Sequence, residues 1–220
     1  MKTQHFIPAL FAAAMIAGVF GCTDRGATEP TRVDTTHPGP IARKPNIYLY
    51  PSTTQRISVR LLFPSGGRIL KGEPEYGSGW LVDVDPGGRI NQQYDYLFYE
   101  AQTPDCYQYE SGWIVQRDNV AEFFRHALTS AGFKGREVSD FLEYWTPRLQ
   151  SNQSYAVFPQ QNELLDNLIA LDVVPKPQTA LRLFFVIRSA QASDAGLRKP
   201  VLHTIERRGF VLAEWGVVIQ

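Results

Sequence analysis

The spacing of apolar residues changes twice along this chain, and this limits the folds open to it. Between about residues 46 and 115, short apolar runs alternate with turn residues as strands do. Residues 119–145 then carry apolar side chains at helical spacing, in two stretches separated near Gly132. Strand patterns return at 155–158, 179–188, 201–205 and 210–218. Strands, a helical pair and strands again predict an α+β domain.

Within this class we expect mostly antiparallel β-sheets in a sandwich-like arrangement. The two helices, 120–131 and 137–145, are expected as an insertion packed on one side. Asn119 and Glu122 form a capping pattern for the first helix, and Gly132 suits its C-terminal end. Pro147 is expected to end or kink the second helix.

The first 21 residues have the layout of a bacterial secretory leader. A basic start is followed by an apolar run from Phe6 to Phe20 and by Gly21 directly before Cys22. The run is too short for a typical membrane-spanning helix. Its ending resembles a lipoprotein signal, in which the cysteine is lipidated and becomes the mature N-terminus. We therefore predict a lipid-anchored cell-envelope protein, with Thr23 favouring the outer over the inner membrane.

Residues 22–44 are predicted to be a disordered tether, because Thr, Pro, Gly and charges dominate and no apolar period appears. Residues 45–220 are then predicted to form a single globular α+β domain. The chain has 22 basic and 22 acidic side chains, and no basic run is interleaved with aromatics. The balance argues against nucleic acid as a partner.

Sequence signals for metal or covalent chemistry are weak. There is no metalloprotease, zinc-ribbon, nucleophile-elbow, phosphate-loop or EF-hand motif, so we predict neither a metal nor a cofactor. If Cys22 is lipidated, Cys106 has no cysteine partner within the chain and is interpreted as a structural or incidental thiol. A catalytic thiol needs a nearby base, and the globular part offers only His126 and His203. Both histidines are interpreted as structural or surface residues.

Three motifs span most of the globular part. They are a KP-x-IYLYP opening at residues 44–51, a YLF-aromatic-E centre at 96–100 and a GF-x-V-x-EWG close at 209–216. In this order they resemble an uncharacterised bacterial family, and the likeness covers about residues 44–216. The chain departs after Gly216, where the resemblance implies a second glycine and Val217 stands instead. The resemblance implies no catalytic residues.

Two glutamates lie on predicted strands with otherwise apolar faces. Alternation places Glu100 beside Phe98, and it places Glu214 beside Leu212. A buried unpaired carboxylate is costly, so each should be paired, protonated or at a rim. Arg182, on the strongest predicted strand, is the candidate partner. We predict a structural ion pair between Arg182 and either Glu100 or Glu214.

Three functions remain open from the sequence. The leading hypothesis is a non-catalytic domain that binds a ligand or an envelope partner, protein or glycan, with Tyr107 and Tyr109 as possible contacts. The first alternative is an envelope hydrolase of glycosidase type, with Glu100 and Glu214 as general acid and base. The second alternative is a structural spacer, which predicts no sizeable pocket. The position of the two carboxylates distinguishes the first two.

Overall fold

The computed structural model describes residues 39–220 of the chain. These residues form ten strands in two sheets and three α-helices, which confirms the α+β class. The strands are β1 (Ile41–Tyr50), β2 (Gln55–Leu62), β3 (Arg68–Glu73), β4 (Trp80–Val84), β5 (Leu97–Gln102), β6 (Trp113–Gln116), β7 (Ser154–Gln161), β8 (Ala170–Val174), β9 (Thr179–Ser189) and β10 (Val211–Ile219). The helices are α1 (Val120–Ala131), α2 (Arg136–Trp145) and α3 (Glu163–Leu168).

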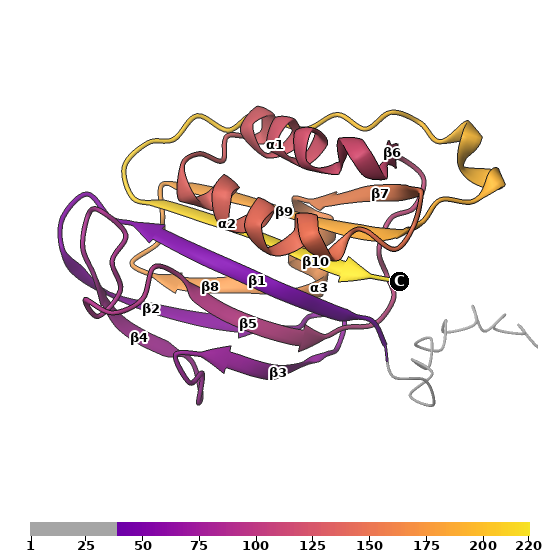
Figure 1. Ribbon diagram of the computed structural model, residues 1–220. Helices are drawn as coiled ribbons and strands as arrows, with labels where there is room; N and C mark the ends of the chain where they lie inside the picture. Colours follow the sequence, from indigo (N-terminus) through magenta and orange to yellow (C-terminus); the bar gives the residue numbers. More distant parts are fainter. Residues whose placement is uncertain (1–38) are drawn as a thin grey trace, which may run out of the picture. The chain divides into compact units, whose positions relative to one another are not determined.

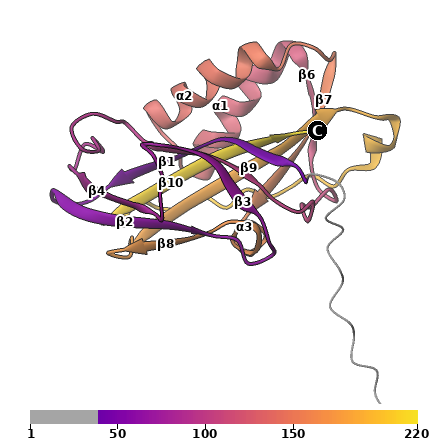
Figure 2. The same cartoon turned by 90° about the horizontal axis from the view of Figure 1, so that it is seen from below.

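The larger sheet has seven strands in the order β3-β5-β1-β10-β9-β7-β6, and the smaller has three in the order β4-β2-β8. Helices α1 and α2 cover one face of the larger sheet (Figure 1). The smaller sheet and α3 lie on its opposite face (Figure 2). Each face therefore has its own apolar core, and the central strands are buried on both sides.

The helix-side core is built from rings that interlock between helices and sheet. Phe124 of α1 and Phe141 of α2 pack against each other and against Phe185 of β9. Trp215 of β10 packs edge-on against Phe141, with ring centroids 5.1 Å apart. These aromatic pairs contribute beyond the area they bury. They fix α1 and α2 on the central strands.

All but one of the strand pairs in the two sheets are antiparallel. The exception is β9 and β10, which run parallel as neighbours. The strap, residues 190–210, joins them by running along the helix-bearing side past α1 (Figure 1). Thr204 Oγ1 donates a hydrogen bond to the carbonyl of Ser130, 2.6 Å away, at the end of α1. The prediction of a strand at 201–205 is wrong, because this segment is part of the strap.

Two further expectations need correction. The prediction of a two-helix insertion on one side is not exact. A third helix, α3, packs in the core between the sheets through Leu165 and Leu168. The predicted tether extended to Lys44, but β1 already begins at Ile41 and buries Ala42. The expected domain boundary at Pro45 lies within the strand, beside a bulge. No helix of residues 39–220 is long and apolar enough to cross a membrane.

Candidate functional site

Lys44 lies in a β-bulge near the start of β1. The register of β1 shifts between Arg43 and Asn46 against β10, and between Ala42 and Asn46 against β5. Lys44 has φ of 53°, a left-handed conformation that costs a non-glycine residue about 1–3 kcal/mol. The residue before a proline also disfavours helical backbone. The surrounding sheet therefore holds this lysine in an unfavourable conformation, a feature that is concentrated at functional sites.

The ammonium group of Lys44 lies among three aromatic rings. Its Nζ is 4.5 Å from the ring centroid of Tyr96, 4.4 Å from that of Phe98 and 5.6 Å from that of Tyr144 on α2. It also donates a hydrogen bond of 3.1 Å to the Tyr96 hydroxyl. Cation–π contacts of this kind stabilise a positive charge without neutralising it. Within residues 39–220, no carboxylate lies within ion-pair distance of this ammonium.

Lys44 borders an open cavity with a volume of about 190 Å³. The other lining residues come from the end of β3, from the segment leading into β5 and from the start of β5; they are Glu73, Gln93, Tyr94, Asp95, Tyr96 and Phe98. Pockets for drug-sized ligands measure about 300–1,000 Å³ and are mostly apolar. This cavity is smaller and is rich in charged and amide groups. It suits one small, polar unit of a ligand.

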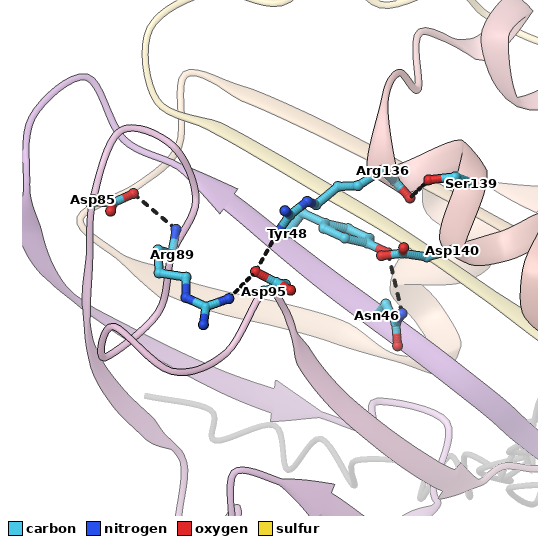
Figure 3. Close-up of polar contacts among 8 residues, drawn as sticks. All are labelled: Asn46, Tyr48, Asp85, Arg89, Asp95, Arg136, Ser139 and Asp140. Atoms are coloured by element: carbon cyan, nitrogen blue, oxygen red, sulfur yellow. Dashed lines mark hydrogen bonds and ion pairs between the residues drawn. The ribbon is translucent and has the colours of Figure 1, made fainter.

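Asp95 connects this cavity to α2. Its Oδ1 accepts hydrogen bonds from Arg89, at 2.5 Å, and from Arg136 at the start of α2 (Figure 3). Partial burial alone would raise the pKa of Asp95, but the hydrogen bonds from Arg89 and Arg136 outweigh it and hold that pKa below its usual value. Asp95 is therefore ionised near neutral pH and acts as a hydrogen-bond acceptor.

A second polar chain runs from β1 to α2. The amide of Asn46 donates to the Tyr48 hydroxyl at 3.3 Å, and Tyr48 donates to Asp140 Oδ2 at 2.8 Å (Figure 3). Asn46 is fully buried, and its Oδ1 has no hydrogen-bond partner among residues 39–220. Burial raises the pKa of Asp140, and the hydrogen bond from Tyr48 opposes this only in part. Asn46 and Tyr48 of the opening motif thus form a polar connection between β1 and α2.

All three sequence motifs meet on the helix-bearing face. Lys44 of the opening motif contacts Tyr96 and Phe98 of the central motif. Trp215 of the closing motif packs against Tyr48, with ring centroids 6.3 Å apart. Sequence reasoning noticed these motifs but did not identify Lys44 as a site residue. The available signal was the lysine–proline pair at the opening of a strand.

Glu100 and Glu214 do not form a catalytic pair. Tyr99 of β5 belongs to the core between the sheets, so its neighbour Glu100 points to the helix-bearing face. Glu214 points to the opposite face, where Tyr99 donates to its Oε1 at 2.7 Å. The seven-stranded sheet separates the two carboxylates. The expectation that they flank one cleft is wrong, and the hydrolase hypothesis loses its proposed acid and base.

Arg182 is held beside Glu214, as the sequence suggested, and Glu100 takes no part in this pair. The Nε of Arg182 donates to Glu214 Oε2 at 2.6 Å, and the Nη2 of Arg182 donates to the carbonyl of Ile169 at 2.8 Å. Its Nη1 pairs with Asp166 of α3. A second hollow of about 100 Å³ opens beside Arg182, Asp166 and His203. Because the guanidinium is already engaged on three sides, we assign this cluster a structural role.

The remaining predicted residues lie away from the cavity. Tyr107 is buried, against expectation, and shares a hydrogen bond of 2.7 Å with Thr103 Oγ1. Burial raises the pKa of Tyr107 to about 12. Tyr109 is half-buried and donates to Asp105 Oδ1 at 2.6 Å. Tyr107 is therefore not an exposed ligand contact, and the Tyr109 hydroxyl is already engaged by Asp105 and Gln220.

Three candidate residues for covalent or metal chemistry have little support. Cys106 is exposed and forms no disulfide within residues 39–220, and His126 and His203 are both exposed. Within the part of the chain that the structure describes, no group of three or more His, Cys, Asp or Glu side chains is placed to hold a metal ion. Cys22 and its predicted lipid lie outside the described residues.

No family model, no curated protein and no solved structure matches this chain. Its function is therefore inferred from the chemistry of the site.

Proposed function

We propose that this protein is a lipid-anchored cell-envelope protein whose folded domain binds a saccharide without catalysing its reaction. The saccharide occupies the cavity beside Lys44. The observation that carries the proposal is the Lys44 ammonium itself, held at the cavity by three rings and a left-handed backbone. Strain at a cavity wall is characteristic of sites in which a side chain is preorganised for a ligand.

The lining of the cavity supports a ligand rich in hydroxyl groups. Asp95 and Glu73 offer carboxylate acceptors, Gln93 offers both a donor and an acceptor, and Lys44 offers donors. Tyr94 adds an aromatic side chain with a polar end. A sugar ring presents hydroxyls around an apolar C–H face, and this mixed lining can contact both. A spacer would not need such a cavity.

A cavity-filling substitution tests the site. Gln93→Trp should lower saccharide affinity at least about tenfold, because the indole occupies the space that the ligand needs. Gln116→Trp, at an exposed position of β6, is the matched control and should leave binding unchanged. Calorimetric titration of the full-length protein in detergent, with fragments of envelope glycans, measures both variants. Equal binding by Gln93→Trp and wild type would place the ligand elsewhere.

The anchor has its own test. Cys22→Ser should release the protein from the membrane fraction or leave it unprocessed with its leader attached, because no thiol remains to be lipidated. Fractionation of cells and the electrophoretic mobility of the protein are the readouts. Cys106→Ser is the control and should leave both unchanged. If Cys22→Ser fractionates and migrates like wild type, the lipoprotein prediction is wrong.

A further inference from the structure

The cavity has one basic side chain, Lys44, and two acidic side chains, Glu73 and Asp95, and this arrangement selects among saccharides. We infer that the ligand is an acidic saccharide and that Lys44 binds the carboxylate of its sugar. This inference rests on the proposed saccharide binding and specifies its ligand class. It assigns Lys44 as the residue that determines specificity.

The Lys44 ammonium has unused binding capacity. An ammonium group carries three N–H donors. Within residues 39–220, Lys44 Nζ makes a single hydrogen bond, to the Tyr96 hydroxyl, and no ion pair. A ligand carboxylate at this point would complete the coordination of the group with a charge-assisted hydrogen bond, which is about twice as strong as a neutral one.

Positive charge continues past Lys44 along the sheet. Phe98 lies on β5 between β1 and β3, and Lys71 of β3 places its Nζ 5.3 Å from the same ring centroid. Phe98 is thus close to two ammonium groups, one from each neighbouring strand. Lys71 is exposed and does not line the cavity. Lys44 is therefore the cation placed to meet a ligand in the cavity.

The acidic lining distinguishes a carboxylate from a more highly charged group. Glu73 and Asp95 line the same cavity as Lys44, and Asp95 is ionised. The charge of Asp95 is balanced by Arg89 and Arg136, whereas Glu73 has no ion pair within residues 39–220. A phosphate or sulfated polymer would bring further negative charge against Glu73, and like charges repel. A sugar with one carboxylate meets Lys44 with the acid and offers its hydroxyl donors to Glu73 and Asp95. The ligand class that satisfies both halves of the cavity is an acidic saccharide.

Three probes of matched size test this inference by calorimetric titration of the full-length protein in detergent. The first is a hexuronic-acid trisaccharide, and the second is the same trisaccharide with its carboxyl groups reduced to alcohols. The third is a peptide of three glutamates, which carries carboxylates without sugar hydroxyls. Wild type should bind the acidic trisaccharide at least about tenfold more tightly than either other probe. Raising the ionic strength should reduce this preference.

Substitution of Lys44 should remove the preference. Lys44→Met should reduce the affinity for the acidic trisaccharide about tenfold and change that for the reduced one little, because only the charge contact is lost. Lys44→Arg should retain the order of the probes. Lys176→Met, an exposed lysine between β8 and β9, is the matched control and should behave as wild type. Circular dichroism verifies the fold of each variant, and the wild-type comparison of probes stands if Lys44→Met does not fold.

The outcomes separate this inference from the function on which it rests. Equal binding of the acidic and reduced trisaccharides overturns the inference and leaves saccharide binding intact. The inference also fails if other envelope saccharides bind and neither trisaccharide does. It fails likewise if saccharides bind but the glutamate peptide binds more tightly than the acidic trisaccharide. In both cases saccharide binding itself stands. If no saccharide binds at all, both the inference and the proposed function fail.

Discussion

Arg182→Met should lower the free energy of unfolding by about 3–5 kcal/mol, because removing one member of a buried ion pair leaves the other charge uncompensated. The Glu214 side chain is 0% exposed and that of Arg182 is 9% exposed. After the substitution, the Tyr99 hydroxyl is the remaining side-chain donor to Glu214 within residues 39–220. The methionine also leaves the Ile169 carbonyl and Asp166 without their guanidinium partner. Chemical denaturation followed by far-ultraviolet circular dichroism measures the change.

A matched arginine elsewhere provides the control. Arg60 pairs with Asp172 on the outer face of the smaller sheet, where its side chain is 59% exposed. Arg60→Met should cost under about 1 kcal/mol, since exposed pairs contribute little. Adding Glu214→Leu to Arg182→Met should recover much of the lost stability, because the uncompensated charge is removed as well. A small effect of Arg182→Met would contradict the structural role of the pair.

This result also bears on function. Glu214 is buried in the core between the sheets and is hydrogen-bonded by both Arg182 and Tyr99. Burial and the nearby Glu214 carboxylate keep the pKa of Tyr99 well above its usual value, so its hydroxyl stays protonated and continues to donate. A carboxylate held this way has no access to a substrate. The contribution of Glu214 is therefore expected in stability measurements and not in ligand affinity.

The predictions from sequence succeeded where the apolar period was strong and local. Helix α1 lies where the spacing placed it, and Gly132 ends it with a left-handed φ of 105°. Strand β4, at residues 80–84, lies in the region where strand patterns were predicted. Two short strands were missed: β3 contains Gly72 and is mostly exposed, and β8 lacks a clean alternation and is followed by Pro175. Their pairing partners are distant in sequence, so local pattern gives little signal.

The site was harder to predict than the fold for a physical reason. Lys44 becomes a cavity residue only because a bulge turns β1 and because Tyr144, a hundred residues later, covers it from α2. Neither the bulge nor this long-range contact leaves a periodic trace in the sequence. By contrast, the pairing of Arg182 with Glu214 could be predicted from the sequence, because both are charged residues on strongly apolar strands. Alternation alone could not show that Glu100 faces the other way across a sheet.

The second large effect is expected at the strap. Arg207→Met should lower the free energy of unfolding by about 3–5 kcal/mol, because it leaves the buried Glu137 carboxylate without its cation. The two terminal guanidinium nitrogens of Arg207, Nη1 and Nη2, donate to Glu137 at 2.8 Å each. The Glu137 side chain is 1% exposed and that of Arg207 is 13% exposed, so water screens the pair little.

The position of this pair explains why the effect should reach beyond two side chains. Glu137 lies in the first turn of α2, and its own carbonyl accepts a hydrogen bond of 2.8 Å from Trp215 Nε1 on β10. Arg207 therefore ties the strap to the helix that covers the sheet, and its guanidinium lies 5.2 Å from the Tyr50 ring centroid at the end of β1.

The neighbouring Arg208 provides the matched control. The side chains of Arg208 and its partner Glu206 are each 75% exposed, so Arg208→Met should lower the free energy of unfolding by less than about 1 kcal/mol. Hydrogen exchange of the α2 amides should accelerate in Arg207→Met and not in Arg208→Met, because the helix loses a contact that holds it on the sheet. Equal stability of the two variants would mean that the strap is held by its other contacts, such as Thr204 with Ser130, and that the buried pair is dispensable.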